Sequence, residues 1–174
     1  MHIITLCGSL RQHSVNAELL DTLGSMKPEG TTIARSQLIP LLPLFNPDLM
    51  AELPAVVAAF EAEIRKADVV VIASPEYAHG ISGVMKNALD WLVGSEVFVN
   101  KAVAVLNAAV RAQHADAALR EVLSMMSVQL LVTASLSIPV APTSRGKLAD
   151  DPVIQAQLQK VWQAIQTTAS EQRP

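Results

Sequence analysis

Asp-Val-Val-Val-Ile-Ala, residues 68–73, is the stretch that decides the fold of this 174-residue chain. Its apolar residues are continuous rather than alternating, and β-branched side chains dominate, which is typical of a strand buried on both faces of a parallel sheet. Ser74 and Pro75 follow at once and end the run. The stretch therefore predicts a central parallel strand that leads directly into a loop.

Strand-like and helix-like segments alternate on both sides of this run. Short apolar runs bounded by Gly, Pro or polar residues predict strands, and apolar residues at helical spacing predict the helices between them. A proline-rich stretch, Leu38–Leu53, is expected to be a long connecting loop. The expected strands are His2–Cys7, Thr31–Ser36, Asp68–Ala73, Lys101–Leu106 and Leu130–Ile138, and the expected helices are Ser14–Met26, one whose first turn holds Pro54, Gly80–Val93, Ala112–Met126 and one opened by Asp151 and Pro152.

Five strands and five helices in βα alternation specify an α/β fold, a parallel sheet with helices on both faces. Because such crossovers are right-handed, few strand orders remain, and the flavodoxin-like order 2-1-3-4-5 is the leading choice. In that three-layer arrangement ligands bind outside the carboxyl ends of the first and third strands. Since we find no repeat, linker or change of composition, we expect one domain over residues 1–174.

Composition excludes several classes of protein. Hydrophobic residues make up 51% of the chain and charged residues 17%, the reverse of a disordered chain. No apolar stretch approaches the roughly 20 residues that cross a bilayer, and the net charge of −3 is dispersed without a basic run. The single cysteine, Cys7, allows no internal disulfide and is expected to be inert packing. With no secretion signal at the amino terminus and no histidine spacing typical of a metal site, we expect a cytoplasmic chain without metal, nucleic-acid or membrane partners.

The loop from Gly8 to Asn16 has the chemistry of a phosphate site. It lies at a predicted helix amino terminus, where free N–H groups and the helix dipole favour an anion. Arg11 offers a forked cation suited to phosphate oxygens, and Ser9 and Ser14 add hydroxyl donors. The loop is neither a dinucleotide-binding nor a Walker glycine motif. An ordinary strand-to-helix turn with Ser14 as the N-cap is the alternative.

The loop that follows the central strand lies beside the first one in the predicted topology. Pro75 fixes the direction of the chain, while Gly80 and Gly83 allow close approach of a ligand to the backbone. Exposed backbone N–H and C=O groups here are suited to the polar edge of a flat heterocycle. Tyr77, the only tyrosine of the chain, has a ring that could cover that heterocycle.

Two motifs together carry a resemblance to a known family. Gly-Ser-Leu-Arg-x-x-Ser-x-Asn begins at Gly8, and Pro-Glu-Tyr-x-x-Gly-x-x-Gly-x-x-Lys-Asn-Ala-x-Asp-Trp begins at Pro75. The chain resembles the NADPH-dependent FMN reductase family, which includes quinone, chromate and azo-dye reductases. The segment Leu42–Leu49 and the spacing of the strands are similar to the family too, so the resemblance covers nearly the whole chain.

The resemblance implies an oxidoreductase with FMN as its cofactor and NADPH or NADH as its electron donor. Hydride would pass from NADPH to FMN and then to a small acceptor such as free flavin, a quinone or another oxidant. Because that chemistry takes place at the flavin, no catalytic side chain is expected. Members of the family are usually homodimers or homotetramers, with the flavin near the subunit interface. The cofactor-binding residues that the resemblance implies are Ser9, Arg11, Ser14, Val15, Asn16, Pro75, Glu76, Tyr77, Ala78, His79, Gly80 and Asn107.

The chain departs from the family at two places. Ala78 stands where the family often has asparagine, and Ala109 stands where a hydroxyl donor is frequent. A lost neutral hydrogen bond costs on the order of 1 kcal/mol, so FMN binding is expected to be weakened rather than abolished. Arg111 is either a contact for the phosphate of a pyridine nucleotide or a solvated side chain.

Two other classes of protein fit the same fold. A flavodoxin-type electron carrier, which binds FMN without oxidising NADPH, is usually strongly acidic and rich in aromatic residues. Here the net charge is only −3 and aromatic residues make up 3%. A magnesium-dependent receiver needs acidic residues at the ends of the first and third strands, but Cys7-Gly8 and Ser74-Pro75 stand there.

Overall fold

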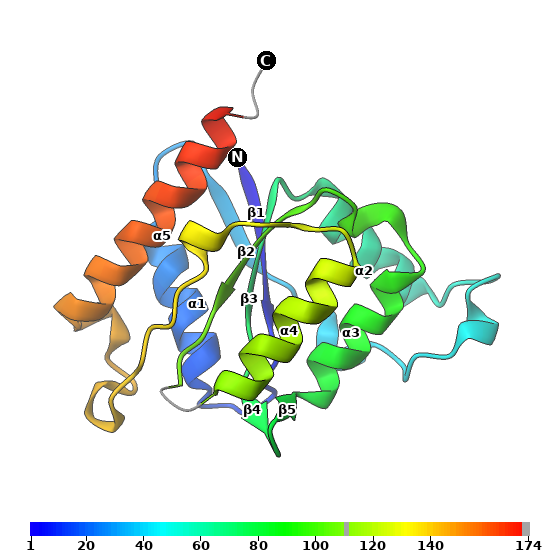
Figure 1. Ribbon diagram of the computed structural model, residues 1–174, viewed down its shortest axis with the longest axis horizontal. Coiled ribbons are helices and arrows are strands. Elements are labelled where there is room, and N and C mark those ends of the chain that lie inside the picture. Colours follow the sequence, from blue (N-terminus) through cyan, green and yellow to red (C-terminus); the bar gives the residue numbers. More distant parts are fainter. Residues whose placement is uncertain (110–111, 172–174) are drawn as a thin grey trace.

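The computed structural model describes residues 1–109 and 112–171, which form a five-stranded parallel sheet with helices on both faces (Figure 1). The strand order is β2-β1-β3-β6-β7, and β4 and β5 pair separately as an antiparallel ribbon. With that ribbon set aside, the order is the expected 2-1-3-4-5, which confirms the predicted fold class. The strands are β1 His2–Cys7, β2 Thr32–Arg35, β3 Val69–Ala73, β4 Glu76–Tyr77, β5 Gly80–Ile81, β6 Ala102–Leu106 and β7 Gln129–Leu130, and the helices are α1 Val15–Ser25, α2 Ala55–Lys66, α3 Gly83–Val93, α4 Gln113–Met125 and α5 Pro152–Glu171.

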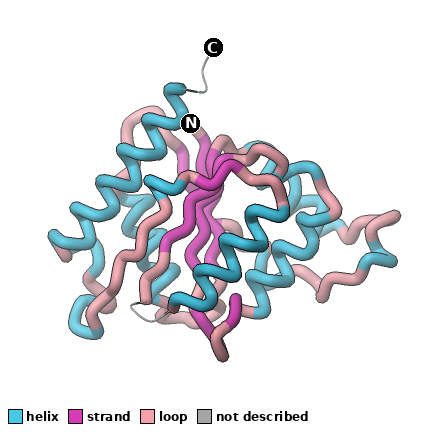
Figure 2. Tube along the Cα trace, in the orientation of Figure 1, coloured by secondary structure: helices cyan, strands magenta, loops and turns pink. Residues whose placement is uncertain are grey.

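The central strand β3 is buried along its whole length and pairs in parallel with β1 on one side and β6 on the other. Its side chains alternate between two cores. Val69 and Val71 pack in the core that α1 and α5 cover, whereas Val70 and Ile72 pack in the core that α2, α3 and α4 cover. Figure 2 shows the strands lying between helices, and burial on both faces explains the continuous apolar run from which the fold was predicted.

The expected strand Leu130–Ile138 was wrong over most of its length. β7 ends at Leu130, a short 3-10 turn occupies Val132–Ala134, and pairing returns only as a bridge between Asn107 and Ser137. The hydroxyl of Ser135 accepts the N–H of Val105 at 3.0 Å, a donor on β6 that a continued strand would have used. A side chain thus replaces part of the ladder, which lets the chain turn away from the sheet edge.

The expected helix Gly80–Val93 begins later than predicted. Gly80 and Ile81 form β5, and Ser82 then caps α3 by accepting the N–H of Met85 at 3.4 Å. Gly80 and Gly83 are therefore not parts of one helix. The first belongs to the ribbon beside the strand ends, and the second opens the helix.

The proline-rich loop Leu38–Leu53 contains two short 3-10 turns and projects from the body beside α3 (Figure 1, cyan). Its root is tied to α3 by side chains of the second motif. Asn87 Nδ2 and Trp91 Nε1 both donate to the carbonyl of Pro43, at 2.9 and 2.8 Å, and Asn87 Oδ1 accepts the N–H of Phe45 at 2.8 Å. The Asn-x-x-x-Trp spacing therefore anchors this loop. Pro54 lies just before α2, as its N-cap residue.

The carboxyl ends of β1, β3 and β6 meet at one edge of the sheet, at the bottom of Figure 1. The starts of α1 and α4 and the β4–β5 ribbon lie at the same edge. Within residues 1–109 and 112–171, no helix is long and apolar enough to cross a membrane.

Candidate functional site

A pocket of about 500 Å³ opens at the carboxyl edge of the sheet. Most of its lining comes from three stretches that follow β1, β3 and β6, which is where ligands bind in open parallel sheets. The predicted first and second loops therefore meet around one cavity. Its lining residues are Ser9, Arg11, His13, Ser14, Val15, Asn16, Pro75, Glu76, Tyr77, Ala108, Ala109, Ala112, Val140 and Arg145.

The phosphate wall, as we call residues 8–16, combines a helix amino terminus with an unpaired cation. Ser14 caps α1, since its Oγ accepts the N–H of Ala17 at 3.3 Å, and Ser9 Oγ accepts the N–H of Arg11 at 3.4 Å. The first N–H groups of a helix have no partners inside it and remain available to an anion. The guanidinium of Arg11 forms no ion pair within the described part of the chain. Ser14 is thus the N-cap, and this role is compatible with a phosphate site.

Gly8 is required where the first and second loops touch. A Cβ atom at this position would lie 2.3 Å from Ser74 Oγ and 2.8 Å from Ser82 Oγ. Those two hydroxyls are 3.2 Å apart and hydrogen-bond each other. The absence of a side chain therefore lets the loop after β1 pack directly against the loop after β3.

The ring wall, residues 75–81, is a tight hairpin. Tyr77 pairs with Gly80, and the two residues between them, Ala78 and His79, have φ values of 48° and 61°. Two consecutive positive φ values are typical of a type I′ turn, in which asparagine and glycine are preferred. The departure at Ala78 therefore has a conformational cost, because an alanine occupies a left-handed position. The Tyr77 side chain lines the pocket and is half exposed.

Glu76 braces this hairpin against α4. Its Oε2 accepts the N–H of Ala115 at 2.9 Å, and its Oε1 lies 3.2 Å from His79 Nδ1. Because α4 has no side-chain cap of its own, Glu76 supplies one from outside the helix. The hydrogen bond from Ala115 holds the pKa of Glu76 below its ordinary value, and nearby His114 and His79 add to the lowering against the effect of burial.

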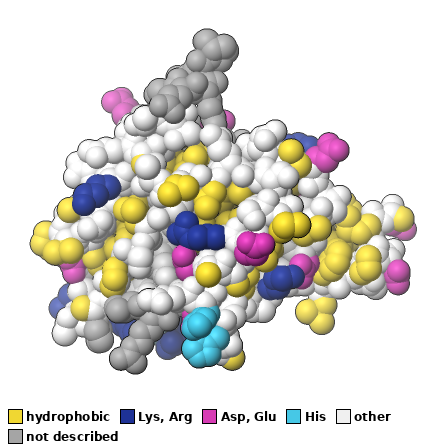
Figure 3. Space-filling view, in the orientation of Figure 1, with side chains coloured by type: hydrophobic (Ala, Val, Ile, Leu, Met, Phe, Trp, Pro, Cys, Tyr) yellow, Lys and Arg dark blue, Asp and Glu magenta, His cyan; other side chains and the backbone are white. Residues whose placement is uncertain are grey.

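His79 and His114 form a second contact between the hairpin and α4. Their ring centroids are 4.5 Å apart and the rings are nearly perpendicular. Histidine side chains gather at the lower edge of the face shown in Figure 3. Neither histidine lines the pocket, so their packing supports the ring wall from behind.

The third wall consists of small residues that follow β6. Asn107 does not line the pocket; its Oδ1 accepts the N–H of Ala109 at 3.0 Å and its Nδ2 donates to the carbonyl of Ala112 at 2.9 Å. Asn107 therefore shapes this wall from behind. The methyl side chains of Ala109 and Ala112 face the cavity instead of a polar group. Arg111, singled out from the sequence, lies outside the described residues.

The pocket brings together eight of the twelve predicted cofactor-binding residues. Among the other four, Ala78, His79 and Gly80 form the turn behind the ring wall, and Asn107 lies behind the third wall. Of the six other lining residues, Ala109 was singled out from the sequence, whereas His13, Ala108, Ala112, Val140 and Arg145 were missed. Arg145 belongs to the segment that returns from the last strand to α5. Because the segment after the last parallel strand also starts at the carboxyl edge of the sheet, its residues could have been predicted to lie near the site.

Cys7 lies at the end of β1 but does not line the pocket. It is 8% exposed, and its Sγ donates to the carbonyl of Ser9 at 3.5 Å. Burial raises the pKa of the Cys7 thiol, with the contact to Ser9 acting in the opposite direction. A protonated, buried thiol is unreactive, as predicted for a packing residue.

Comparisons with known proteins agree with this geometry. The family described as NADPH-dependent FMN reductase matches residues 1–143. An NAD(P)H-dependent FMN reductase of Pseudomonas aeruginosa is 34% identical over 92% of this chain and 94% of its own length. A quinone reductase of Escherichia coli K12 is 39% identical over 53% of this chain, a match that spans half of that enzyme.

Solved structures share the fold at lower identity. A flavoenzyme NAD(P)H:(acceptor) oxidoreductase of Paracoccus denitrificans superposes with a TM-score of 0.70, at 23% identity over 94% of this chain and 98% of that one. An azoreductase of Bacillus anthracis gives a TM-score of 0.64, at 17% identity over 94% and 97%. Fold, pocket and sequence match thus agree, and the chain belongs to the NADPH-dependent FMN reductase family.

Proposed function

We propose that this chain binds FMN in the pocket and is an NAD(P)H-dependent oxidoreductase that reduces small acceptors such as quinones or free flavin. One observation carries the proposal: an anion-binding wall and a backbone-rich hairpin face one cavity at the point where the strand order reverses. The family match and the names of the relatives support the same reaction class.

The donor set of the phosphate wall fits the phosphate end of FMN. Ser9, Arg11 and the first N–H groups of α1 would hold the phosphate, because they supply hydroxyl, guanidinium and amide donors around a helix amino terminus. No carboxylate side chain belongs to this wall, so nothing in it repels a dianion. This fit supports a monophosphate ligand rather than a neutral one.

The ring wall fits the flat end of the same ligand. The segment Pro75–Tyr77 would present main-chain groups to the polar edge of the ring, and the alanines of the third wall would pack on its apolar part. FMN, when bound, would supply the hydride-transfer chemistry between NAD(P)H and an acceptor. The residues of the chain would bind and orient it. Glu76 acts as a positioning residue, because its carboxylate is engaged with Ala115.

The test is an anaerobic visible spectrum. The protein is mixed with FMN, desalted, and measured before and after NADPH is added. Retained flavin absorbance that bleaches, and that returns when a quinone is added, is the expected result. Retained flavin that neither NADPH nor NADH bleaches would identify an electron carrier instead. If no flavin is retained and NADPH is not oxidised with quinone or added FMN, the proposal fails.

We also propose a cytoplasmic homodimer or homotetramer. The projecting loop supports association, since Leu41 is 63% and Leu44 84% exposed, and hydrophobic side chains gather over this projection (Figure 3). Light scattering during gel filtration tests this: a mass above the monomer's 18.6 kDa is expected, and Leu44→Asp should lower it. A monomer at micromolar concentration would contradict the proposal.

A further inference from the structure

A second hollow, the α1 groove, adjoins the pocket. It has a volume of about 680 Å³ and lies between α1 and the segment 145–150. The two hollows share Arg11, His13, Ser14, Val15 and Arg145 on their common wall, so part of the phosphate wall lines both of them. On its α1 side the groove extends from Ser14 to Ser25, which is ~16 Å at the helical rise. Its volume is in the range typical of small-molecule sites, roughly 300–1,000 Å³.

The outer wall of the groove, segment 145–150, is held against α1 by hydrogen bonds. Glu18 on α1 accepts two N–H groups of that wall, from Gly146 at 2.9 Å and from Leu148 at 3.0 Å. Leu148 is fully buried, and Gly146 has a φ of 78°, a left-handed conformation suited to glycine. The groove therefore has a built shape between two anchored elements.

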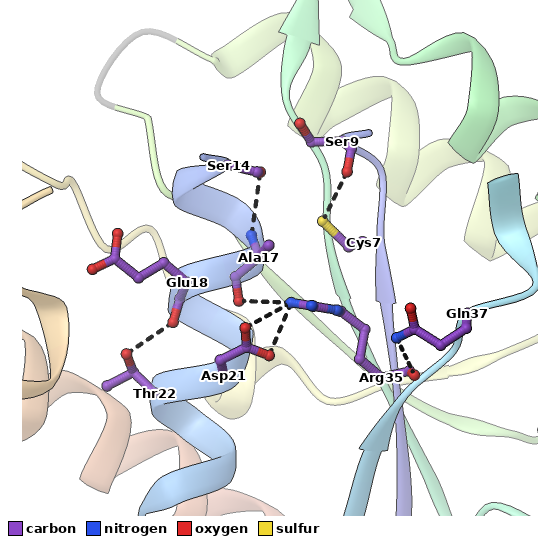
Figure 4. A network of polar contacts seen from close by, with 9 residues as sticks. All are labelled: Cys7, Ser9, Ser14, Ala17, Glu18, Asp21, Thr22, Arg35 and Gln37. Atoms are coloured by element: carbon purple, nitrogen blue, oxygen red, sulfur yellow. Dashed lines mark hydrogen bonds and ion pairs between the residues drawn. The ribbon is translucent and has the colours of Figure 1, made fainter. Parts of the chain in front are cut away.

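Some charged side chains of the α1 groove have partners within the protein, and others are available to a ligand. Arg35 bridges to α1, where it pairs with Asp21 at 2.8 Å and donates to the carbonyl of Ala17 at 3.3 Å (Figure 4). This cation is neutralised. The charge of Glu18 is likewise engaged with the two N–H groups of the outer wall.

The available groups are three cations, at the junction and on the outer wall, together with the Asp150 carboxylate. Arg11 and Arg145 reach the junction from loops 134 positions apart, and Lys147 lines the groove beyond them. None of the three forms an ion pair in residues 1–109 or 112–171. Two guanidinium groups match the charge of one phosphate dianion, so Lys147 is the cation left for a second anionic group beyond the junction.

The rest of the groove suits a nucleoside. Ala17 and Ala149 offer small apolar surfaces to the face of a base, and the Asp150 carboxylate is an acceptor for ribose hydroxyls or an exocyclic amine. The lining of the groove thus combines phosphate donors, small apolar surfaces and a hydroxyl acceptor, which are the features that an adenosine phosphate requires.

We propose that the α1 groove binds the adenosine-phosphate part of a dinucleotide, continuous with the FMN phosphate site. The proposal rests on the proposed function, because the bound flavin phosphate defines the junction. Two ligands carry this group: FAD, whose adenylate half extends beyond the flavin phosphate, and the pyridine-nucleotide donor. The first would widen the flavin specificity of the site, and the second would explain how the donor is recognised.

The test uses two titrations and a pair of charge-reversal variants. Flavin-free protein is titrated with FMN and with FAD by quenching of flavin fluorescence. FMN-loaded protein is titrated with AMP and with adenosine 2′,5′-bisphosphate by calorimetry. Lys147→Glu alters the groove without touching the FMN pocket, and Lys66→Glu, on α2 across the sheet, makes the same charge change elsewhere.

We expect at least one adenylate ligand to bind, with an affinity that Lys147→Glu lowers about fivefold or more and Lys66→Glu leaves unchanged. FMN affinity should be the same in all three proteins. If Lys147→Glu weakens the binding of FAD alone, the groove binds the adenylate half of FAD. If it weakens the binding of the adenine nucleotides to FMN-loaded protein, the groove binds the adenylate part of the pyridine-nucleotide donor. Absence of adenylate binding, or binding insensitive to Lys147→Glu, would overturn the proposal. If FMN fails to bind, the proposed function fails, and AMP titrated into the flavin-free protein still tests the groove.

Discussion

The phosphate wall and the ring wall of the pocket are built in opposite ways. The phosphate wall ends in a serine-capped helix, and none of its residues has a positive φ. The ring wall turns through two non-glycine residues in the left-handed region and needs Glu76 to brace it against α4. The comparison indicates that the phosphate wall is relaxed and preformed, whereas the hairpin stores strain that a neighbouring element balances.

The largest effect is expected from Arg11→Ala, which removes the cation of the phosphate wall. A hydrogen bond to a charged group is worth about 1.5–3 kcal/mol, so FMN affinity should fall between about 10- and 150-fold. Riboflavin affinity should hardly change, because riboflavin has no phosphate. Fluorescence titration with both flavins measures the difference. Arg120→Ala is the control, because Arg120 is paired with Asp116 on α4. An equal loss for FMN and riboflavin would contradict the assignment.

A smaller effect is expected from Glu76→Ala, which removes the brace of the ring wall. With its acceptor lost, the N–H of Ala115 at the start of α4 has no partner, so the melting temperature should fall by several degrees. FMN and riboflavin should weaken together, because the hairpin would face the ring and not the phosphate. Glu76→Gln keeps an acceptor and should lose less. Loss of FMN affinity alone would place Glu76 in the phosphate site instead.

The same brace has a defined pH dependence. Because the folded-state pKa of Glu76 is lowered, its contribution to stability is complete above the ordinary glutamate pKa. It is lost as pH falls through the lower folded-state value. The difference in unfolding free energy between the wild type and Glu76→Gln should thus be constant near neutral pH and shrink in acid. Denaturant melts at several pH values measure it, and a difference that grows in acid would contradict the brace.

The sequence was informative for the sheet and the phosphate wall because both depend on local patterns. The β-branched run of β3, the serine N-cap of α1 and the Asp151 cap of α5, whose Oδ1 accepts the N–H groups of Val153 and Ile154, are short-range features. Hydrophobic periodicity and capping chemistry identify such features directly.

The misplaced elements depend on partners far away in the sequence. The hydroxyl of Ser135 interrupts the last strand because it reaches Val105, and Glu76 stabilises the hairpin because it reaches Ala115. Arg145 joins the pocket because Glu18 anchors the segment beside it. A single sequence contains no local signal for these contacts, which span 30 residues or more.

A gain in stability is expected from Ala78→Gly. A non-glycine residue in the left-handed region costs roughly 1–2 kcal/mol, which glycine would relieve. Glycine also increases the conformational entropy of the unfolded chain, which offsets part of this gain, so the net increase in unfolding free energy is about 0.5–1 kcal/mol. The melting temperature should rise by about 1–3 °C. Ala51→Gly is the matched control, because Ala51 is exposed and is not among the residues with positive φ, so glycine there should destabilise. Equal effects of the two changes would show that the turn is unstrained.

The smallest effect concerns Cys7, at the root of the phosphate wall. Because burial raises the pKa of its thiol, iodoacetamide should alkylate the folded protein far more slowly than the urea-unfolded protein at neutral pH. If the phosphate wall is preformed, saturating FMN should change the rate of Cys7 alkylation in the folded protein by less than about twofold. The reason is that alkylation then depends only on opening of the core around β1. Strong protection by FMN would mean that the phosphate wall opens when no ligand is bound. The contrast with the strained ring wall would then disappear, since both walls would need the cofactor to hold their shape.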